Sequence, residues 1–94
     1  MSDCPLVLIK WEDSRQPAPA WTYVRNLSAQ YRPVICVSVG WLVQDTNECK
    51  VLCQNFGDME SENAQASGVM VIPTRCVISV ERLVEKDEDE AIAA

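Results

Sequence analysis

Short apolar runs separated by polar turns recur along this chain of 94 residues, and the pattern predicts strands. The longest run covers residues 34–43, in which Ser38 is the one hydroxyl residue and Gly40 the one glycine. The polar cluster at 45–48 leads into "CKVLCQN", where side chains that alternate between two faces are typical of a strand. These two strands and their short connection predict a hairpin.

Three more strands are expected, at residues 6–12, 68–72 and 76–83. Pro73 places a turn between the last two, because proline fixes φ and lacks a backbone donor. Residues 56–67 have little apolar periodicity, so we expect a long exposed loop there.

A different pattern separates the first two strands. "DSRQPAPA" contains Pro17 and Pro19 and predicts an extended loop. Trp21, Val24 and Leu27 then follow at helical spacing, which predicts about two turns of helix over residues 21–30 with one apolar side. We expect Trp21 to dock this helix on the sheet.

The predicted fold is mainly β: a small five-stranded SH3-like barrel with one short helix between strands 1 and 2. Closure of the sheet would remove its exposed edges. The order of strand, proline turn and strand in "VMVIPTRCVISVERL" resembles the last two strands of SH3-like barrels, which a single 3₁₀ turn connects, and the Sm-like fold is the competing template. Gly40 would permit the bend of a strand shared by both halves of the barrel.

Length and charge indicate one domain over residues 1–83 and an acidic, solvated tail over 84–94. The net charge is −6. Residues 81–94 hold six acids and two bases, whereas residues 1–80 hold eight acids and six bases. The body is therefore nearly balanced, and most of the acidity lies at the C-terminal end.

The five cysteines are an odd number within apolar segments, which indicates reduced thiols that serve mainly as small core residues. The longest apolar run is about half of what a transmembrane helix needs, and the N-terminal residues have no basic region or cleavage site. We therefore expect a cytoplasmic protein with no membrane partner.

The residue types argue against an enzyme. The chain has no histidine, so it lacks the commonest general base and metal ligand. Cys49 and Cys53 are the one close cysteine pair, and their spacing on a strand suits core packing better than zinc. Glu12 and Asp13 are adjacent acids at a strand end, where acids are expected in any case. No catalytic residue, metal site or cofactor is predicted.

A set of motifs resembles a known group of proteins. It comprises "IKWEDS", Trp21, "VSVGWLVQD" with the following turn and "KVL", and "GVMVIPTRCVISVERL", and it covers about residues 6–83. These features resemble small proteins of unassigned function that bacteriophages and prophages encode. The resemblance implies an accessory phage product made in the cytoplasm of the bacterial host, and it implies no site residues.

Two functions follow as expectations. The first is a non-enzymatic protein that binds a host protein or sequesters a small ligand, for instance to inhibit a bacterial defence; a homo-oligomer would place ligand sites at its symmetric interfaces. Its candidate binding residues lie in and beside loops: Trp11, Glu12, Asp13, Phe56 and Arg75. The alternative is a nucleic-acid adaptor of the SH3-like or Sm-like kind, which the dispersed basic residues disfavour.

Overall fold

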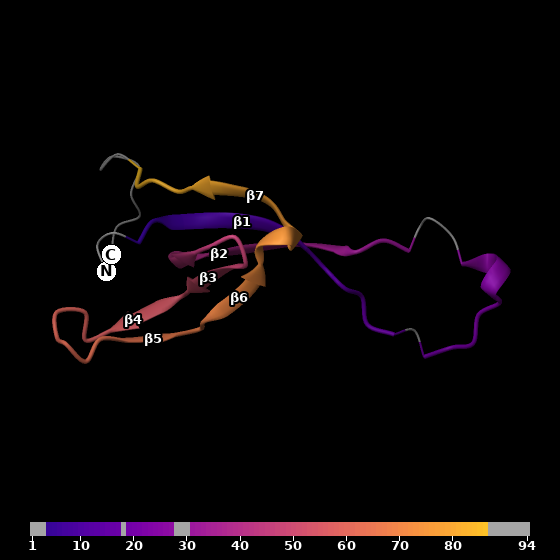
Figure 1. Cartoon of the computed structure of the whole chain (residues 1–94), viewed down its shortest axis with the longest axis horizontal. Helices are drawn as coiled ribbons and strands as arrows, with labels where there is room; N and C mark the ends of the chain where they lie inside the picture. The colour runs from indigo at the N-terminus through magenta and orange to yellow at the C-terminus, as the bar shows by residue number, and fades with distance from the viewer. Residues whose placement is uncertain (1–3, 18, 28–30, 87–94) are drawn as a thin grey trace.

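Five antiparallel strands form the main sheet of the protein (Figure 1). The computed structural model describes residues 4–17, 19–27 and 31–86. The sheet order is β6-β3-β2-β1-β7, made by β6 (Met70–Pro73), β3 (Cys49–Cys53), β2 (Val34–Asp45), β1 (Leu6–Asp13) and β7 (Val77–Arg82). The prediction of a mainly β protein is confirmed.

The long strand β2 is shared by two halves of the sheet. It pairs with β1 from Val34 opposite Asp13 to Trp41 opposite Leu6, and with β3 from Trp41 opposite Cys53 onward. Gly40 lies at this changeover, and a Cβ atom added there would lie 2.8 Å from the backbone oxygen of Cys53. Glycine therefore allows a close approach of two backbones. The register irregularity of β2 lies slightly farther along, between Leu42 and Gln44.

The prediction of a closed barrel is wrong. Among the described residues, β6 pairs with β3 alone and β7 pairs with β1 alone, so the sheet stays open at both ends. β6 has four residues and ends at Pro73, which has no N–H to donate, so little strand remains to close against β7. The predicted turn after Pro73 is confirmed as the 3₁₀ turn η2 (Thr74–Cys76).

A small apolar core lies on one face of the sheet. Its buried members come from three strands: Val7, Ile9, Leu52 and Ile72. Trp11, Leu42 and Val77 pack against them and are themselves half-buried. The Trp11 indole donates a hydrogen bond from Nε1 to Oγ of Ser38 at 3.0 Å, so its polar atom is satisfied within the fold.

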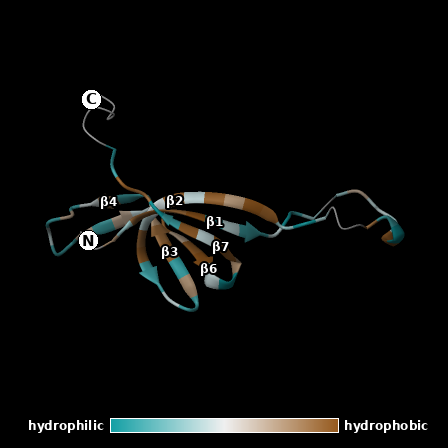
Figure 2. Ribbon diagram, turned by 90° about the horizontal axis from the view of Figure 1, so that it is seen from above, coloured by the Kyte–Doolittle hydropathy of each residue, from teal (hydrophilic) through white to brown (hydrophobic). Residues whose placement is uncertain are grey.

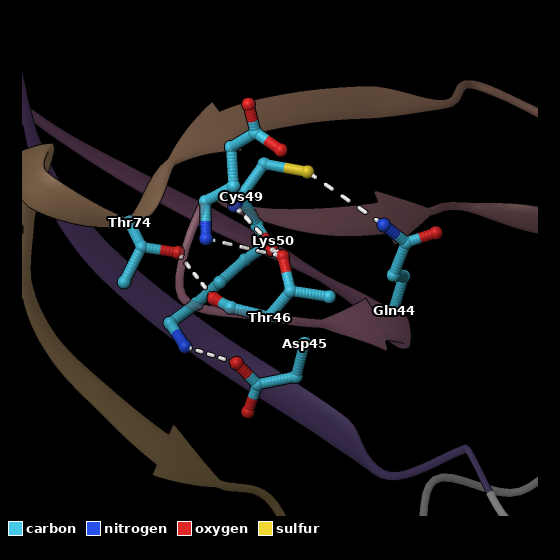
Figure 3. Close-up of polar contacts among 7 residues, drawn as sticks. Gln44, Asp45, Thr46, Cys49, Lys50 and Thr74 are labelled. Atoms are coloured by element: carbon cyan, nitrogen blue, oxygen red, sulfur yellow. Dashed lines mark hydrogen bonds and ion pairs between the residues drawn. The ribbon is translucent and has the colours of Figure 1, made fainter.

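The turn between β2 and β3 is fixed to η2 by side-chain hydrogen bonds (Figure 3). The Thr46 hydroxyl accepts from the backbone N–H groups of Glu48 and Cys49 and donates to the Cys49 carbonyl. Thr74 of η2 donates from Oγ1 to the Thr46 carbonyl at 2.8 Å, and Lys50 pairs with Asp45. The Thr74 contact holds η2 beside the hairpin that the sequence predicted, and the other contacts stabilise the hairpin itself.

Two short strands, β4 (Asn55–Gly57) and β5 (Gln65–Ser67), pair where a long loop was expected. The prediction of a long loop over 56–67 is therefore wrong at its two ends, which pair as strands, whereas its expected exposure is confirmed for residues 57–67. Residues 58–64 connect the two strands and begin with a turn, in which Asp58 adopts a left-handed φ of 52° and its carbonyl accepts from the Ser61 N–H at 3.0 Å. Apolar periodicity missed these strands because Phe56 is the one side chain in them that is not exposed.

The segment between β1 and β2, residues 14–33, is here named the arm, and its described residues project away from the sheet (Figure 1). The expected two-turn helix at 21–30 is wrong: the described residues form the single 3₁₀ turn η1 (Val24–Asn26), and 28–30 lie outside the described residues. The radius of gyration is 18.3 Å, whereas roughly 12–13 Å is typical of a compact domain of this length. The molecule is thus elongated by its arm.

The chain leaves the sheet after β7, where the Leu83 N–H donates to the Leu6 carbonyl at 2.8 Å. Residues 87–94 of the expected acidic tail lie outside the described residues. Within the described part of the chain, no helix has the length and apolar character needed to cross a membrane.

Candidate functional site

The arm carries the most unusual chemistry of the chain. Residues 14–33 contain three arginines and no acid, whereas the remaining positions hold five bases and fourteen acids. Strand pairing reaches Asp13 and Val34, so the arm begins directly at the end of two paired strands. At its base the Arg15 guanidinium donates from Nε to the backbone oxygen of Arg32, which joins its outgoing and returning chains.

Exposed apolar side chains gather at the tip of the arm. Trp21 is fully exposed (103%), and Tyr23 and Val24 are 71% and 81% exposed. The prediction that Trp21 docks on the sheet is therefore wrong. The Arg25 guanidinium lies 4.9 Å from the centroid of the Tyr23 ring, which places a positive charge on an aromatic face.

The local backbone explains how the tip presents these side chains. Tyr23 and Leu27 are extended, and η1 closes between them through the hydrogen bond from Leu27 N–H to the Val24 carbonyl at 3.0 Å. A single 3₁₀ turn cannot bury an apolar stripe as a two-turn helix would. The tip side chains consequently point into solvent.

Four of the five binding residues predicted from the sequence lie toward one end of the sheet. Trp11, Glu12 and Asp13 form the end of β1, and Arg75 lies in η2, which contacts β1. Trp11 is paired with Val77, the residue that follows η2. The Trp11 indole is half-buried and bonded to Ser38, whereas the two acids and Arg75 are exposed.

Phe56, the fifth predicted residue, lies apart from this group in β4. It is half-buried, and its ring centroid is 5.5 Å from that of Trp41. Trp41 lies opposite Cys53, which is fully buried, so Phe56 packs beside the β2–β3 junction. Phe56 is thus held by packing and does not join the other four.

A shallow hollow of about 410 Å³ lies between β2 and the start of β6. Its walls are mostly apolar, with Val37, Val39, Val69 and Met70 among the lining residues. The hollow is open to solvent, and none of the described residues that line it is charged. It suits an apolar side chain or strand better than a charged metabolite.

The cysteines are all unpaired thiols. Burial raises the pKa of the Cys53 thiol, with a further contribution from the nearby Cys4, so this group stays protonated rather than becoming a nucleophile. In the parts of the chain that the structure describes, no group of three or more His, Cys, Asp or Glu residues could hold a metal ion.

Sequence reasoning missed the arm as a site because it assigned Trp21, Val24 and Leu27 to a helix face. The charge pattern was the available signal, since residues 14–44 contain no acid and all three basic residues of this run lie in the arm, within a chain whose net charge is −6. Comparisons of the chain with protein-family models, with curated proteins and with solved structures give no match.

Proposed function

We propose that this chain is a non-enzymatic binding protein that engages a partner protein with the tip of its arm. The observation that supports it most is the complete exposure of Trp21 beside Tyr23 and Val24. Large aromatic side chains that are not packed within their own fold are typical anchors of protein interfaces. The aromatics stand beyond the end of the sheet, where they can enter a concave surface.

The charge of the arm defines the chemistry of that partner. Arg15 and Arg25 belong to a segment without acids, so a matching surface is acidic and has an apolar pocket for an indole ring. The rest of the chain is strongly acidic and would repel such a surface, which directs it to the arm.

The resemblance to small phage and prophage proteins suggests the biological setting. A phage accessory protein made in the bacterial cytoplasm would meet host proteins, and a binding protein without catalytic chemistry would act by occupying one of them. Inhibition of a bacterial defence component is the function of this kind that we propose.

Site-specific cross-linking tests the proposal. Benzoylphenylalanine replaces Trp21 at the arm tip, and in a matched control it replaces Glu85, which is exposed near the other end of the described chain. A host protein cross-linked from position 21 alone is then purified and titrated with the Trp21→Ala variant. We expect at least roughly a 30-fold loss of affinity, as for an interface anchor worth about 2 kcal/mol. Equal affinities of the wild type and Trp21→Ala would contradict the proposal.

A nucleic-acid adaptor is the second candidate, because the acid-free arm combines arginines with Trp21, Tyr23 and Tyr31. The net charge of −6 works against it through long-range repulsion of phosphates. Titration of single-stranded RNA at low salt separates the two functions. Binding that weakens steeply with added salt and is lost in an Arg15→Ala, Arg25→Ala variant would favour the adaptor; a flat titration would exclude it.

A further inference from the structure

One edge of β2 has no partner over half of its length. Residues 34–40 pair with β1 on one side, while β3 begins to pair on the other side at Trp41. In the described part of the chain, no backbone hydrogen bond besides the β1 ladder involves residues 34–39. In an antiparallel strand every second residue points its N–H and C=O toward this open side, which makes it a template for another strand.

The same part of β2 is apolar and uncharged. On its outer face Ile35, Val37 and Val39 are 52%, 57% and 44% exposed, and residues 34–43 contain no charged side chain (Figure 2). Natural edge strands are usually protected by a charge, a proline or a bulge against pairing. None of these devices occurs in residues 34–40, so this edge is suited to pairing.

A hollow lies beside residues 37–39 of this edge, and within it the Met70 sulfur accepts from Oγ of Ser38 at 3.6 Å. The hollow of about 410 Å³ borders Val37, Ser38 and Val39, and its opposite wall is formed by Gln54 and residues 68–70. A strand that pairs with β2 can therefore place side chains against Val69 and Met70.

We infer that the occupant of this edge is a second copy of the chain, paired antiparallel through β2 about a two-fold axis at Val37. The pairing is self-complementary: Val37 meets Val37 of the second copy, and Ile35 meets Val39 of the second copy. Both pairs join β-branched apolar side chains on the outer face, which is a favourable cross-strand combination. The two sheets then become continuous, and two strand edges are removed by one isologous contact.

The charges of the chain favour the antiparallel arrangement. The arm holds three arginines and no acid, and the β4–β5 hairpin holds Asp58, Glu60 and Glu62 and no base. These two elements lie at opposite ends of the elongated molecule (Figure 1). An antiparallel pair brings the arm of each copy toward the acidic hairpin of the other, whereas a parallel pair would bring like charges together.

Sedimentation of single-residue variants tests the contact. The wild type is expected to sediment as a dimer of 10.5 kDa chains at micromolar concentrations. Val37→Lys places two like charges opposite each other at the two-fold axis and should raise the dimer dissociation constant at least 100-fold. Ile78→Lys is the matched control, because Ile78 is a similarly exposed apolar residue (49%) on the edge strand β7.

Ile35→Lys provides a second variant of the same edge. The melting temperature of each variant, measured at low protein concentration, shows that the fold is retained. Dimers lost in both β2 variants and kept in Ile78→Lys would support the inference. A wild type that stays monomeric at about 1 mM, a concentration at which even a weak interface forms, would overturn the inference. Dissociation of the dimer by Ile78→Lys alone would also overturn it.

Charge exchange tests the orientation. The double variant Arg15→Glu, Arg25→Glu and the double variant Asp58→Arg, Glu60→Arg should each weaken the dimer, and the combined variant should recover it. Weakening without recovery would overturn the antiparallel arrangement. This inference goes beyond the proposed function, since capture of a host protein by Trp21 is measured separately and does not require a dimer.

Discussion

Replacement of Gly40 by alanine should destabilise the fold, because two backbones meet at this position. An alanine Cβ would lie 2.8 Å from the carbonyl oxygen of Cys53 and 3.4 Å from the Cβ of Leu52. The nearest atom belongs to the backbone of a paired strand, so the added methyl group can be accommodated only if β2 and β3 separate locally.

The cost follows from this geometry. Added atoms in a tightly packed site typically cost about 1–3 kcal/mol. At about 4–8 °C per kcal/mol for a domain of this size, a cost of about 2 kcal/mol lowers the melting temperature by roughly 8–16 °C. Gly40→Val adds two more methyl groups and should lower it further.

Circular dichroism melting measures the effect, and Gly57→Ala is the matched control. A Cβ atom at Gly57 meets nothing within 4 Å, so this variant should melt close to the wild type. Equal melting temperatures of Gly40→Ala and Gly57→Ala would refute the close approach of β2 and β3.

Three further predictions concern stability. Trp11→Phe removes the 3.0 Å hydrogen bond to Ser38, so a double-mutant cycle with Ser38→Ala should give a coupling of about 1 kcal/mol in urea unfolding; additive effects would exclude the bond. Gly68 has a left-handed φ of 69°, so Gly68→Ala should cost about 1–2 kcal/mol in the same assay, and a neutral effect would contradict that backbone conformation. Burial, and then Cys4, raises the pKa of the Cys53 thiol above its usual 9.0. The unfolded chain therefore loses this proton first, and the melting temperature should fall as pH rises above 9.0, less so in Cys53→Ala; identical pH profiles would contradict the raised pKa.

Local patterning predicted the strands of the main sheet well. The alternation in "CKVLCQN" and the run that begins at Val34 correspond to β3 and β2, and Pro73 marks the turn before β7. These features are local, since a hydrophobic run followed by a turn cluster specifies a hairpin from its own residues.

The errors concern contacts that the local pattern does not specify. Closure of a barrel depends on whether β6 and β7 pair with each other. The sequence of β6, which has four residues and ends in proline, does not specify whether this pairing forms. The spacing of Trp21, Val24 and Leu27 suits a helix face, but a helix of two turns is stable mainly when that face packs on something. Among the described residues Trp21, Val24 and Leu27 pack on no such surface, and the segment forms a 3₁₀ turn.

The candidate site was predicted less well than the fold. The position of Trp11 next to a proline loop predicts a binding residue, yet its indole is bonded within the fold, and Phe56 packs on Trp41. The spacing of Trp21 predicts packing, but this side chain is fully exposed. A sequence indicates which aromatics are present, but exposure is decided by tertiary contacts that aromatic spacing alone does not encode.

The central claim is that Trp21 stands free of the body and is the tryptophan that a partner covers. Fluorine NMR of protein labelled with 5-fluorotryptophan tests it directly, with a dissolved nitroxide as the probe of exposure and the cross-linked host protein as the partner. We predict that the nitroxide broadens the Trp21 resonance far more than those of Trp11 and Trp41, and that the partner protects it. Equal broadening of all three resonances, or protection of Trp11 or Trp41 in place of Trp21, would contradict the account.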